Sequence, residues 1–190
     1  MAERQTADTL EQIRADHVAR YMWVRGAVAG KDVVDIGCGV GYGASIMSES
    51  AKSVHAFDRD MDAIEYAMLK WSRPGIKFSM MEATGLWDCG RYDVAVAFEI
   101  VEHLQHPELM LRRARACCRS LFISAPNEDG MPFDKKRFPF HERHYRSDEM
   151  VALLESCGWI VQGFFHQKGR ESSVEYGHDA GARTLVYAAS

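Results

Sequence analysis

One stretch, Val33 to Gly43, limits what this chain can fold into more than any other part of it. The stretch begins with hydrophobic residues, as a buried strand does, and continues with a glycine at every second position from Gly37. Glycines in such a run let backbone N–H groups and the start of a helix approach a ligand where any side chain would collide. The run therefore predicts a strand, a ligand-binding loop and a helix, in that order.

The rest of the chain alternates short β-rich runs with amphipathic stretches. We expect strands at residues 31–37, 53–58, 77–82, 92–98, 120–126, 159–167 and 183–189. This alternation predicts an α/β, Rossmann-like fold with a seven-stranded, mostly parallel sheet and helices on both faces. Residues 168–182 contain no periodic helix, so we expect a hairpin that leaves the last strand antiparallel.

Helical spacing predicts which faces of the helices pack on the sheet. One expected face consists of Ile64, Ala67, Met68 and Trp71, and a more mixed one of Leu109, Arg112, Arg113 and Ala116. A helix from Thr9 to Gly26 is expected within an N-terminal helical cover at residues 1–28. Its stripe of Ile13, His17, Tyr21 and Val24 either covers the ligand cleft or serves as a simple amphipathic brace, and both can hold.

Length and charge limit the class of protein. A chain of 190 residues without repeats or linkers is expected to form one domain over residues 1–190. Its formal net charge of −4 gives no general attraction for polyanions, so a nucleic acid partner is not indicated, although a local basic patch leaves one open. The charged start and the absence of a long apolar run predict a soluble, cytoplasmic protein without a membrane partner. Five cysteines without zinc-site spacing are expected to be free thiols.

The glycine run leaves two interpretations of the ligand open. Residues 39–44 satisfy the loose pattern of a dinucleotide-binding loop, which would indicate a nicotinamide-dependent oxidoreductase. Asp35 argues against this, because a dehydrogenase usually has an apolar residue there, whereas a carboxylate can hold the ammonium end of an adenosyl ligand with an amino-acid tail. Asp58, at the end of the second strand, can accept hydrogen bonds from ribose hydroxyls in either class of ligand.

A second group of polar residues follows the fourth strand, which ends at Phe98. The spacing of Glu99, Glu102 and His103 brings them to one side of a helical turn. His141 lies in the long segment 126–146, which must cross the same end of the sheet. This segment, with its phenylalanines and a basic triplet, is predicted to be an acceptor-side loop. The alternative is a surface excursion that its phenylalanines anchor.

These features together resemble class I S-adenosylmethionine-dependent methyltransferases, over most of the chain. The resemblance is carried by residues 20–43, FDRD at 57–60, YDVAVAFEIVEHL at 92–104 and SAPN at 124–127. It implies S-adenosylmethionine as cofactor, with Arg20 and Tyr21 closing over the methionine end. The residues implied to bind the cofactor are Arg20, Tyr21, Asp35, Gly37, Cys38, Gly39, Gly41, Asp58, Arg59, Glu82, Ala83 and Phe98. One departure is that residues 115–119 replace the usual Leu-Lys-Pro-Gly-Gly turn.

The E-x-x-E-H motif followed by a later histidine resembles the O-methyltransferases of small-RNA 3′-terminal ribose and of ubiquinone synthesis; the wider architecture also resembles glycan-associated methyltransferases. In the first two families the four side chains can bind a divalent ion, here magnesium, manganese or zinc at Glu99, Glu102, His103 and His141. Such an ion lowers the pKa of the attacking hydroxyl.

Other roles for these side chains remain open. Glu99 is often a cofactor-side residue in members without metal, and His103 can be a helix-start histidine that only shapes the pocket. Without an ion, His103, His141 or His144 is the candidate general base. The resulting hypothesis is O-methyl transfer to a small hydroxylated acceptor, such as a sugar or glycan, a ribose or a catechol-like ring. A non-catalytic cofactor-binding module is the remaining alternative.

Overall fold

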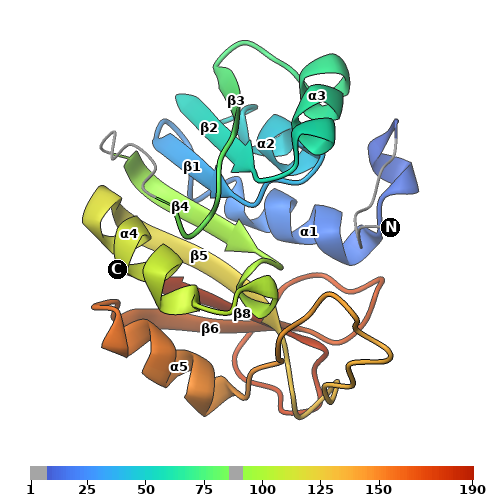
Figure 1. The fold of residues 1–190 in the computed structure, drawn as a ribbon, viewed down its shortest axis with the longest axis vertical. Helices are drawn as coiled ribbons and strands as arrows, with labels where there is room; N and C mark the ends of the chain where they lie inside the picture. The colour runs from blue at the N-terminus through green and yellow to red at the C-terminus, as the bar shows by residue number, and fades with distance from the viewer. Residues whose placement is uncertain (1–7, 86–91) are drawn as a thin grey trace.

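The computed structural model describes residues 8–85 and 92–190, which form one central sheet (Figure 1). Its strands follow the order β3-β2-β1-β4-β5-β8-β6-β7. Their bounds are β1 Asp32–Ile36, β2 Ser53–Asp58, β3 Ile76–Met80, β4 Tyr92–Phe98, β5 Cys118–Pro126, β6 Val161–Gln167, β7 Glu175–Tyr176 and β8 Thr184–Ala189. Each expected strand is present with ends that differ by at most two residues, and the two-residue strand β7 is additional.

The pairing of the strands confirms the predicted class of fold. Strands β1 to β5 pair in parallel, and β8 pairs antiparallel with both β5 and β6. The order reverses between β1 and β4, because the chain first builds outward to β3 and then returns to the other side of β1. In such a sheet, ligands bind at the carboxyl ends of the strands beside this reversal.

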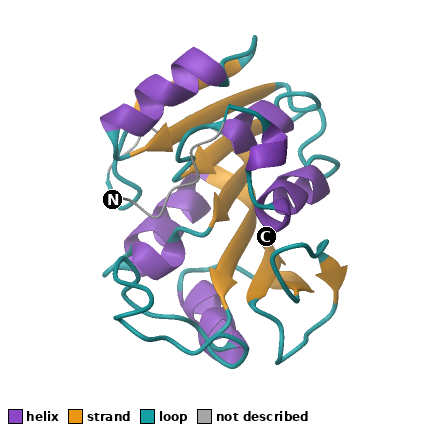
Figure 2. Ribbon diagram, turned by 90° about the vertical axis from the view of Figure 1, so that its right-hand side faces the viewer, coloured by secondary structure: helices purple, strands orange, loops and turns teal. Residues whose placement is uncertain are grey.

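Helices cover both faces of the sheet (Figure 2). The longer ones are α1 Ala15–Val24, α2 Tyr42–Met47, α3 Met61–Lys70, α4 Pro107–Cys117 and α5 Ser147–Ser156, and two 3-10 turns are η1 Leu10–Gln12 and η2 Val101–His103. Alternate residues of one strand enter different cores: Val33 packs in the core with α1, α2 and α3, and Val34 in the core with α4 and α5. Among these helices, which belong to the described ranges, none has the length and apolar character needed to cross a bilayer.

The expected packing faces are right in part. In α3, Ile64, Ala67 and Trp71 are buried, but the Met68 side chain is 51% exposed. In α4 the expected face is wrong, since Leu109 is 49% exposed. The buried stripe of α4 consists of Pro107, Met110, Leu111, Ala114 and Cys117. Periodicity alone failed here because three arginines interrupt the apolar pattern of the helix and several faces fit it equally well.

The N-terminal helix is shorter than expected. Ile13 is extended and Arg14 is also non-helical, with ψ angles of 144° and 132°, and the two residues separate η1 from α1. The predicted stripe survives this break, because Ile13, Tyr21 and Val24 are buried. The break turns the Arg14 side chain toward the carboxyl edge of the sheet, where it takes part in the site described below.

The cysteines differ from expectation at one position. Cys38, Cys118 and Cys157 carry reduced, buried thiols. Cys117 is disulfide-bonded, so the expectation of free thiols throughout the chain is wrong there. Sequence spacing gave no warning, because it does not reveal which cysteines the fold brings together.

Two long connections meet at the carboxyl edge of the sheet. The segment 126–146 and the segment 168–182 lie side by side beyond the ends of β5 and β6 (Figure 1). Asn127 holds them together, since its Nδ2 donates to the carbonyls of Ala180 at 2.9 Å and Ala182 at 2.7 Å. The predicted acceptor-side segment is therefore anchored in the fold at its start.

Candidate active site

A cavity of about 430 Å³ opens at the carboxyl edge of the sheet, beside the reversal in strand order. The loops that follow β1, β2, β3, β4 and β5 all contribute to its walls, together with α1 and the two long connections. The cavity brings together most of the residues that the sequence singled out: Arg20, Tyr21, Gly37, Cys38, Gly39, Asp58, Arg59, Glu82, Ala83, Phe98, Glu99, Glu102, His103 and His141. Asp35, Gly41 and His144 do not line it and lie behind its walls.

The glycine loop has the backbone that its sequence requires. Gly37, Gly39 and Gly41 have φ angles of 73°, 54° and 89°, which other residues rarely adopt. A Cβ at Gly37 would lie 2.8 Å from Ile100, whereas one at Gly39 would meet nothing within 4 Å. Gly39 therefore leaves open space on the cavity side, and a ligand can approach its backbone.

Gly43 has a different role, because it makes room for a tyrosine. A Cβ there would lie 2.2 Å from the ring of Tyr21, a buried residue. We expect Gly43→Ala to lower the free energy of unfolding by about 1 to 3 kcal/mol, as overpacking of a core does. Urea denaturation measures this, with Gly26→Ala as control, because a Cβ at Gly26 meets nothing within 4 Å. Equal effects of the two substitutions would contradict the packing role.

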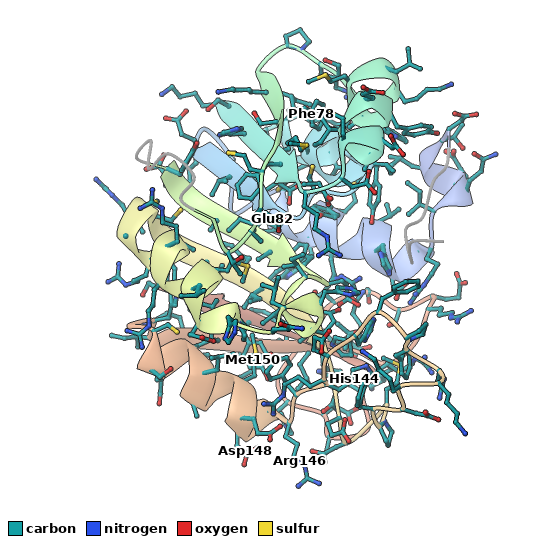
Figure 3. The ribbon with its side chains drawn as sticks, in the orientation of Figure 1. Phe78, Glu82, His144, Arg146, Asp148 and Met150 are labelled. Carbon is teal, nitrogen blue, oxygen red and sulfur yellow. The ribbon has the colours of Figure 1, made fainter. Side chains whose placement is uncertain are left out.

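Asp58 is fixed at the end of β2 by two backbone amides. Its Oδ2 accepts a hydrogen bond from the Gly39 N–H and its Oδ1 one from the Asp60 N–H, both at 3.0 Å. The carboxylate thereby ties the glycine loop to β2 and lines the cavity. Glu82, on the chain after β3 (Figure 3), and Arg59 border the same end of the cavity.

Asp35 is a buried carboxylate beneath the glycine loop. It is fully buried, and its Oδ1 accepts a hydrogen bond of 3.4 Å from the Tyr21 hydroxyl. Its Oδ2 has no hydrogen-bond partner. Burial raises the pKa of Asp35 to about 7, although the hydrogen bond from Tyr21 acts in the opposite direction. An ionised carboxylate here lacks the compensation that buried charges need, and a cation beside the loop would supply it.

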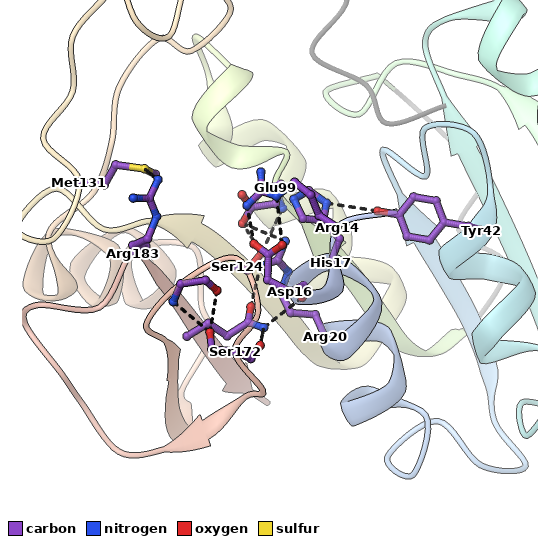
Figure 4. A network of polar contacts seen from close by, with 12 residues as sticks. Arg14, Asp16, His17, Arg20, Tyr42, Glu99, Ser124, Met131, Ser172 and Arg183 are labelled. Carbon is purple, nitrogen blue, oxygen red and sulfur yellow. Dashed lines mark hydrogen bonds and ion pairs between the residues drawn. The ribbon is translucent and has the colours of Figure 1, made fainter. Parts of the chain in front are cut away.

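A buried polar network joins α1 to the end of β4 (Figure 4). Arg20, 1% exposed, donates from Nη1 to Gln167 Oε1 at 2.6 Å, and its Nη2 lies 3.8 Å from Glu99 Oε1. Arg20 Nε and Nη2 and His17 Nε2 are buried without hydrogen bonds. Burial and the charge of Arg20 lower the pKa of His17 to about 4, so His17 is neutral near pH 7. Arg20 and His17 both line the cavity, so their nitrogen atoms lie close to where a carboxylate could bind.

Glu99 belongs to this network and does not join the other three predicted metal ligands. Among the non-glycine residues that the structure describes, Glu99 alone has a positive φ angle, 53°. Its Oε1 accepts a 2.9 Å hydrogen bond from Ser124 Oγ. Burial alone would raise the pKa of Glu99, but Arg20 and His17 outweigh it and hold the pKa below its usual value. The predicted helical turn begins only at Val101, so Glu99 lies outside the turn that was expected to bring it beside Glu102.

Glu102, His103 and His141 form a compact set, called here the His–Glu cluster. Potential ligand atoms of the three side chains all lie within 4.8 Å of one another. His103 Nδ1 lies 3.0 Å from the Phe140 carbonyl, so it must donate and the lone pair is on Nε2. The cluster joins the short turn after β4 to segment 126–146, and the Glu142 N–H donates to the Glu102 carbonyl at 2.7 Å across this junction.

The tautomer of His141 is fixed through His144. His144 Nδ1 lies 2.6 Å from the Met131 carbonyl and must donate to it, which leaves His144 Nε2 as an acceptor. His141 Nδ1 lies 2.8 Å from that Nε2 and donates to it, so the His141 lone pair is on Nε2. Burial and the neighbouring histidines lower the pKa of His141 to about 4. A neutral imidazole with this tautomer is the form that ligates metal ions.

The sequence did not reveal several residues of the site. Ser124 and Gln167 anchor Glu99 and Arg20, and Arg170 and Arg183 line the cavity. Gln167 is 147 residues from Arg20 along the chain, and no local pattern reports such a contact. Only the position of Ser124 near the end of a parallel strand could have suggested that it lies at the site edge.

Comparison with known proteins bears on what binds in this cavity. The model of the family described as "Methyltransferase domain" matches residues 9–162. The chain belongs to this methyltransferase family. The resemblance to class I S-adenosylmethionine methyltransferases is thus confirmed, and family membership decides against the nicotinamide-dependent alternative.

Individual relatives and structures agree with the family. A probable S-adenosylmethionine-dependent methyltransferase of Mycolicibacterium smegmatis is 29% identical over 80% of this chain, which spans only 62% of that relative's length. A ubiquinone biosynthesis O-methyltransferase of Vibrio parahaemolyticus is 31% identical to this chain, and the match covers 83% of this chain and 77% of that relative's length. The fold matches an S-adenosylmethionine-dependent methyltransferase of Mesorhizobium loti with a TM-score of 0.74 at 15% identity, over 95% of this chain and 99% of that one.

Proposed function

We propose that this methyltransferase-family chain transfers the methyl group of S-adenosylmethionine to a hydroxyl oxygen of a small acceptor, such as a sugar, a ribose or a catechol-like ring. The observation that carries the proposal is that one cavity contains both the glycine loop and the His–Glu cluster. The similarity to a relative named as an O-methyltransferase supports oxygen as the methylated atom.

The cofactor end of the cavity offers a partner for each part of the ligand. Asp58 and Glu82 supply carboxylates for the ribose and the adenine amino group, and Arg59 supplies a planar cation for stacking. The buried donors of Arg20 and His17 suit the carboxylate of the methionine end. Asp35 supplies the negative charge for its ammonium group from beneath the loop.

The His–Glu cluster fits a divalent ion. One carboxylate and two imidazoles, with each ring oriented by a hydrogen bond behind it, form a common set of metal ligands. Two nitrogen ligands favour manganese or zinc over magnesium, which prefers oxygen. When bound, such an ion lowers the pKa of the acceptor hydroxyl and holds its oxygen in place.

The transfer itself needs no covalent enzyme intermediate. The hydroxyl oxygen forms a bond to the methyl carbon as the sulfur–carbon bond breaks, the electron pair remains on sulfur, and the hydroxyl proton leaves to a base. Without an ion, His103 Nε2 can accept this proton from within the cavity, whereas His144 lies behind the wall and positions His141. With an ion on the cluster the Nε2 lone pair would be used for the metal, and the proton would leave to solvent water. Direct transfer requires the oxygen about 3 to 3.5 Å from the methyl carbon.

The proposal is tested by measuring release of S-adenosylhomocysteine with a panel of nucleosides, sugars, phenols and amines. We expect turnover with at least one hydroxylated class, and a product that carries the new methyl group on oxygen by mass spectrometry and NMR. Turnover confined to amines, or a methyl group on nitrogen or carbon, would contradict O-methylation while leaving the cofactor assignment intact.

A further inference from the structure

Positive charge is concentrated on the acceptor side of the cavity. Arg14, Arg137, Arg170 and Arg183 all line it together with the His–Glu cluster. They come from four separate parts of the chain: the break before α1, segment 126–146, the connection 168–182 and the residue before β8. The chain as a whole has a net charge of −4, so its composition does not account for this concentration.

Three of these guanidinium groups have no acidic partner among the residues that the structure describes. Arg14 pairs with Asp16, its Nη2 lying 2.5 Å from Asp16 Oδ2. Within residues 8–85 and 92–190, no carboxylate oxygen lies within 4.0 Å of the guanidinium nitrogens of Arg137, Arg170 or Arg183. Unneutralised positive charge in a concave site attracts anions strongly, because the low-dielectric walls focus its field.

Arg137 and Arg183 are both tied to the segment that carries the His–Glu cluster. Arg183 Nη2 lies 3.1 Å from Met131 Sδ (Figure 4). This sulfur atom is uncharged, so it does not neutralise the positive charge of Arg183. The Arg137 guanidinium lies 5.1 Å from the centre of the Phe138 ring, which stacks on His141 with a centroid distance of 5.1 Å. Both arginines are therefore placed close to the proposed site of methyl transfer.

Arg170 approaches the cavity from the opposite connection. Its carbonyl accepts a hydrogen bond of 3.0 Å from the Asp16 N–H, which places the start of α1 beside segment 168–182. The Arg14–Asp16 pair is thus a neighbour of Arg170, and its charges largely cancel. The net positive charge of this side comes from Arg137, Arg170 and Arg183.

We propose that the acceptor is a small molecule that carries a phosphate group, held by Arg137, Arg170 and Arg183 while its hydroxyl lies at the His–Glu cluster. This proposal rests on the proposed function. Three guanidinium groups exceed what the two oxygens of one carboxylate can engage, whereas a phosphate has three terminal oxygens and close to two negative charges. A cavity of about 430 Å³ in an acidic chain fits a small phosphorylated molecule better than a nucleic acid, which needs basic surface outside the cavity.

The test is calorimetric titration of inorganic phosphate into the 190-residue chain, both unliganded and loaded with S-adenosylhomocysteine. We expect one saturable site, with affinity at least about 10-fold lower in Arg137→Gln and in Arg183→Gln, the loss expected for one charge-assisted contact. Arg119→Gln is the matched control, since Arg119 is exposed at the amino end of β5, the opposite edge of the sheet. All variants should keep the wild-type affinity for S-adenosylhomocysteine and the wild-type unfolding midpoint.

Other outcomes overturn the proposal in distinguishable ways. Phosphate affinity that is absent, or equal in all variants, removes the phosphate site. Acetate that binds as tightly as phosphate, with the same loss in the variants, assigns a carboxylate acceptor instead. A single-stranded oligoribonucleotide that binds more tightly than phosphate and is also weakened by Arg119→Gln assigns a nucleic acid. Failure of S-adenosylhomocysteine to bind contradicts the proposed function alone, because phosphate is also titrated into the unliganded chain.

Discussion

His141→Ala is expected to reduce kcat by a factor of about 10² to 10⁴, because it removes one of the three side chains that we propose to bind the metal ion and activate the acceptor hydroxyl. A chelator should produce a loss of similar size in the wild-type chain and little further loss in the variant. The measurements are kcat and KM with an acceptor from the panel, together with Mn²⁺ binding followed by electron paramagnetic resonance.

His144→Ala separates positioning from ligation. His144 is 3% exposed and fixes the tautomer of His141, so its loss should weaken Mn²⁺ binding by about 10- to 100-fold, and excess Mn²⁺ should restore much of kcat. His106→Ala is the control, because this exposed histidine precedes α4 and its ring lies 3.3 Å from the carboxylate of nearby Glu108. A chelator without effect, together with an active His141→Ala variant, would remove the ion from the mechanism.

Asp35→Asn is expected to change cofactor binding and stability in opposite directions. Loss of the negative charge beneath the glycine loop should weaken binding of S-adenosylhomocysteine by about 10- to 100-fold, the value of a charge-assisted hydrogen bond. The unliganded variant should be more stable at pH 8, by on the order of 1 to 4 kcal/mol, because the buried carboxylate has a pKa of about 7 instead of its ordinary 3.8. Calorimetric titration and urea denaturation measure the two effects.

The pH dependence of this stability difference has a definite sign. Between about pH 4 and pH 7 the folded chain retains the Asp35 proton that the unfolded chain has released, so this residue lowers stability as the pH rises through that window. The shifts of His17 and His141 act oppositely, since both pKa values fall to about 4 and the unfolded chain binds the extra protons. The quantity to measure is therefore the free energy of unfolding of the wild type minus that of Asp35→Asn at each pH. The histidine contributions cancel in this difference.

Asp32→Asn is the matched control for Asp35→Asn. Asp32 begins the same strand but pairs with Lys52 at 2.7 Å at the partly exposed end of β1. It should leave cofactor affinity unchanged, and its difference in stability from wild type should stay constant between about pH 5 and pH 8, because the hydrogen bond with Lys52 lowers the Asp32 pKa and confines its titration to lower pH. An Asp35→Asn variant that binds S-adenosylhomocysteine as tightly as wild type would show that Asp35 serves the fold and not the cofactor.

Local chemistry in the sequence predicted the parts of the fold that depend on neighbouring residues. The glycine run predicted the loop after β1, in which three glycines have positive φ angles, and unbroken apolar stretches such as 94–98 predicted the strands buried on both faces. These features can be predicted from the sequence because a strand, a turn and a helix start each need particular residue types within a few positions. The antiparallel position of β8 followed from the absence of a helix in 168–182.

Contacts between distant segments could not be predicted in the same way. Glu99 fits a helical turn by spacing, but Ser124, from the next strand, fixes it in a left-handed backbone conformation that spacing does not reveal. Arg137 belongs to the basic triplet that the sequence analysis noted. Arg170 and Arg183 were missed, since they reach the cavity only because segments 126–146 and 168–182 lie together.

Calorimetric titration with S-adenosylhomocysteine and, separately, with NAD⁺ shows whether the glycine loop, with Asp35 and Asp58, binds an adenosyl sulfonium ligand. We expect one saturable site for S-adenosylhomocysteine and no heat of binding from NAD⁺. Saturable binding of NAD⁺ by a chain that does not bind S-adenosylhomocysteine would contradict this expectation.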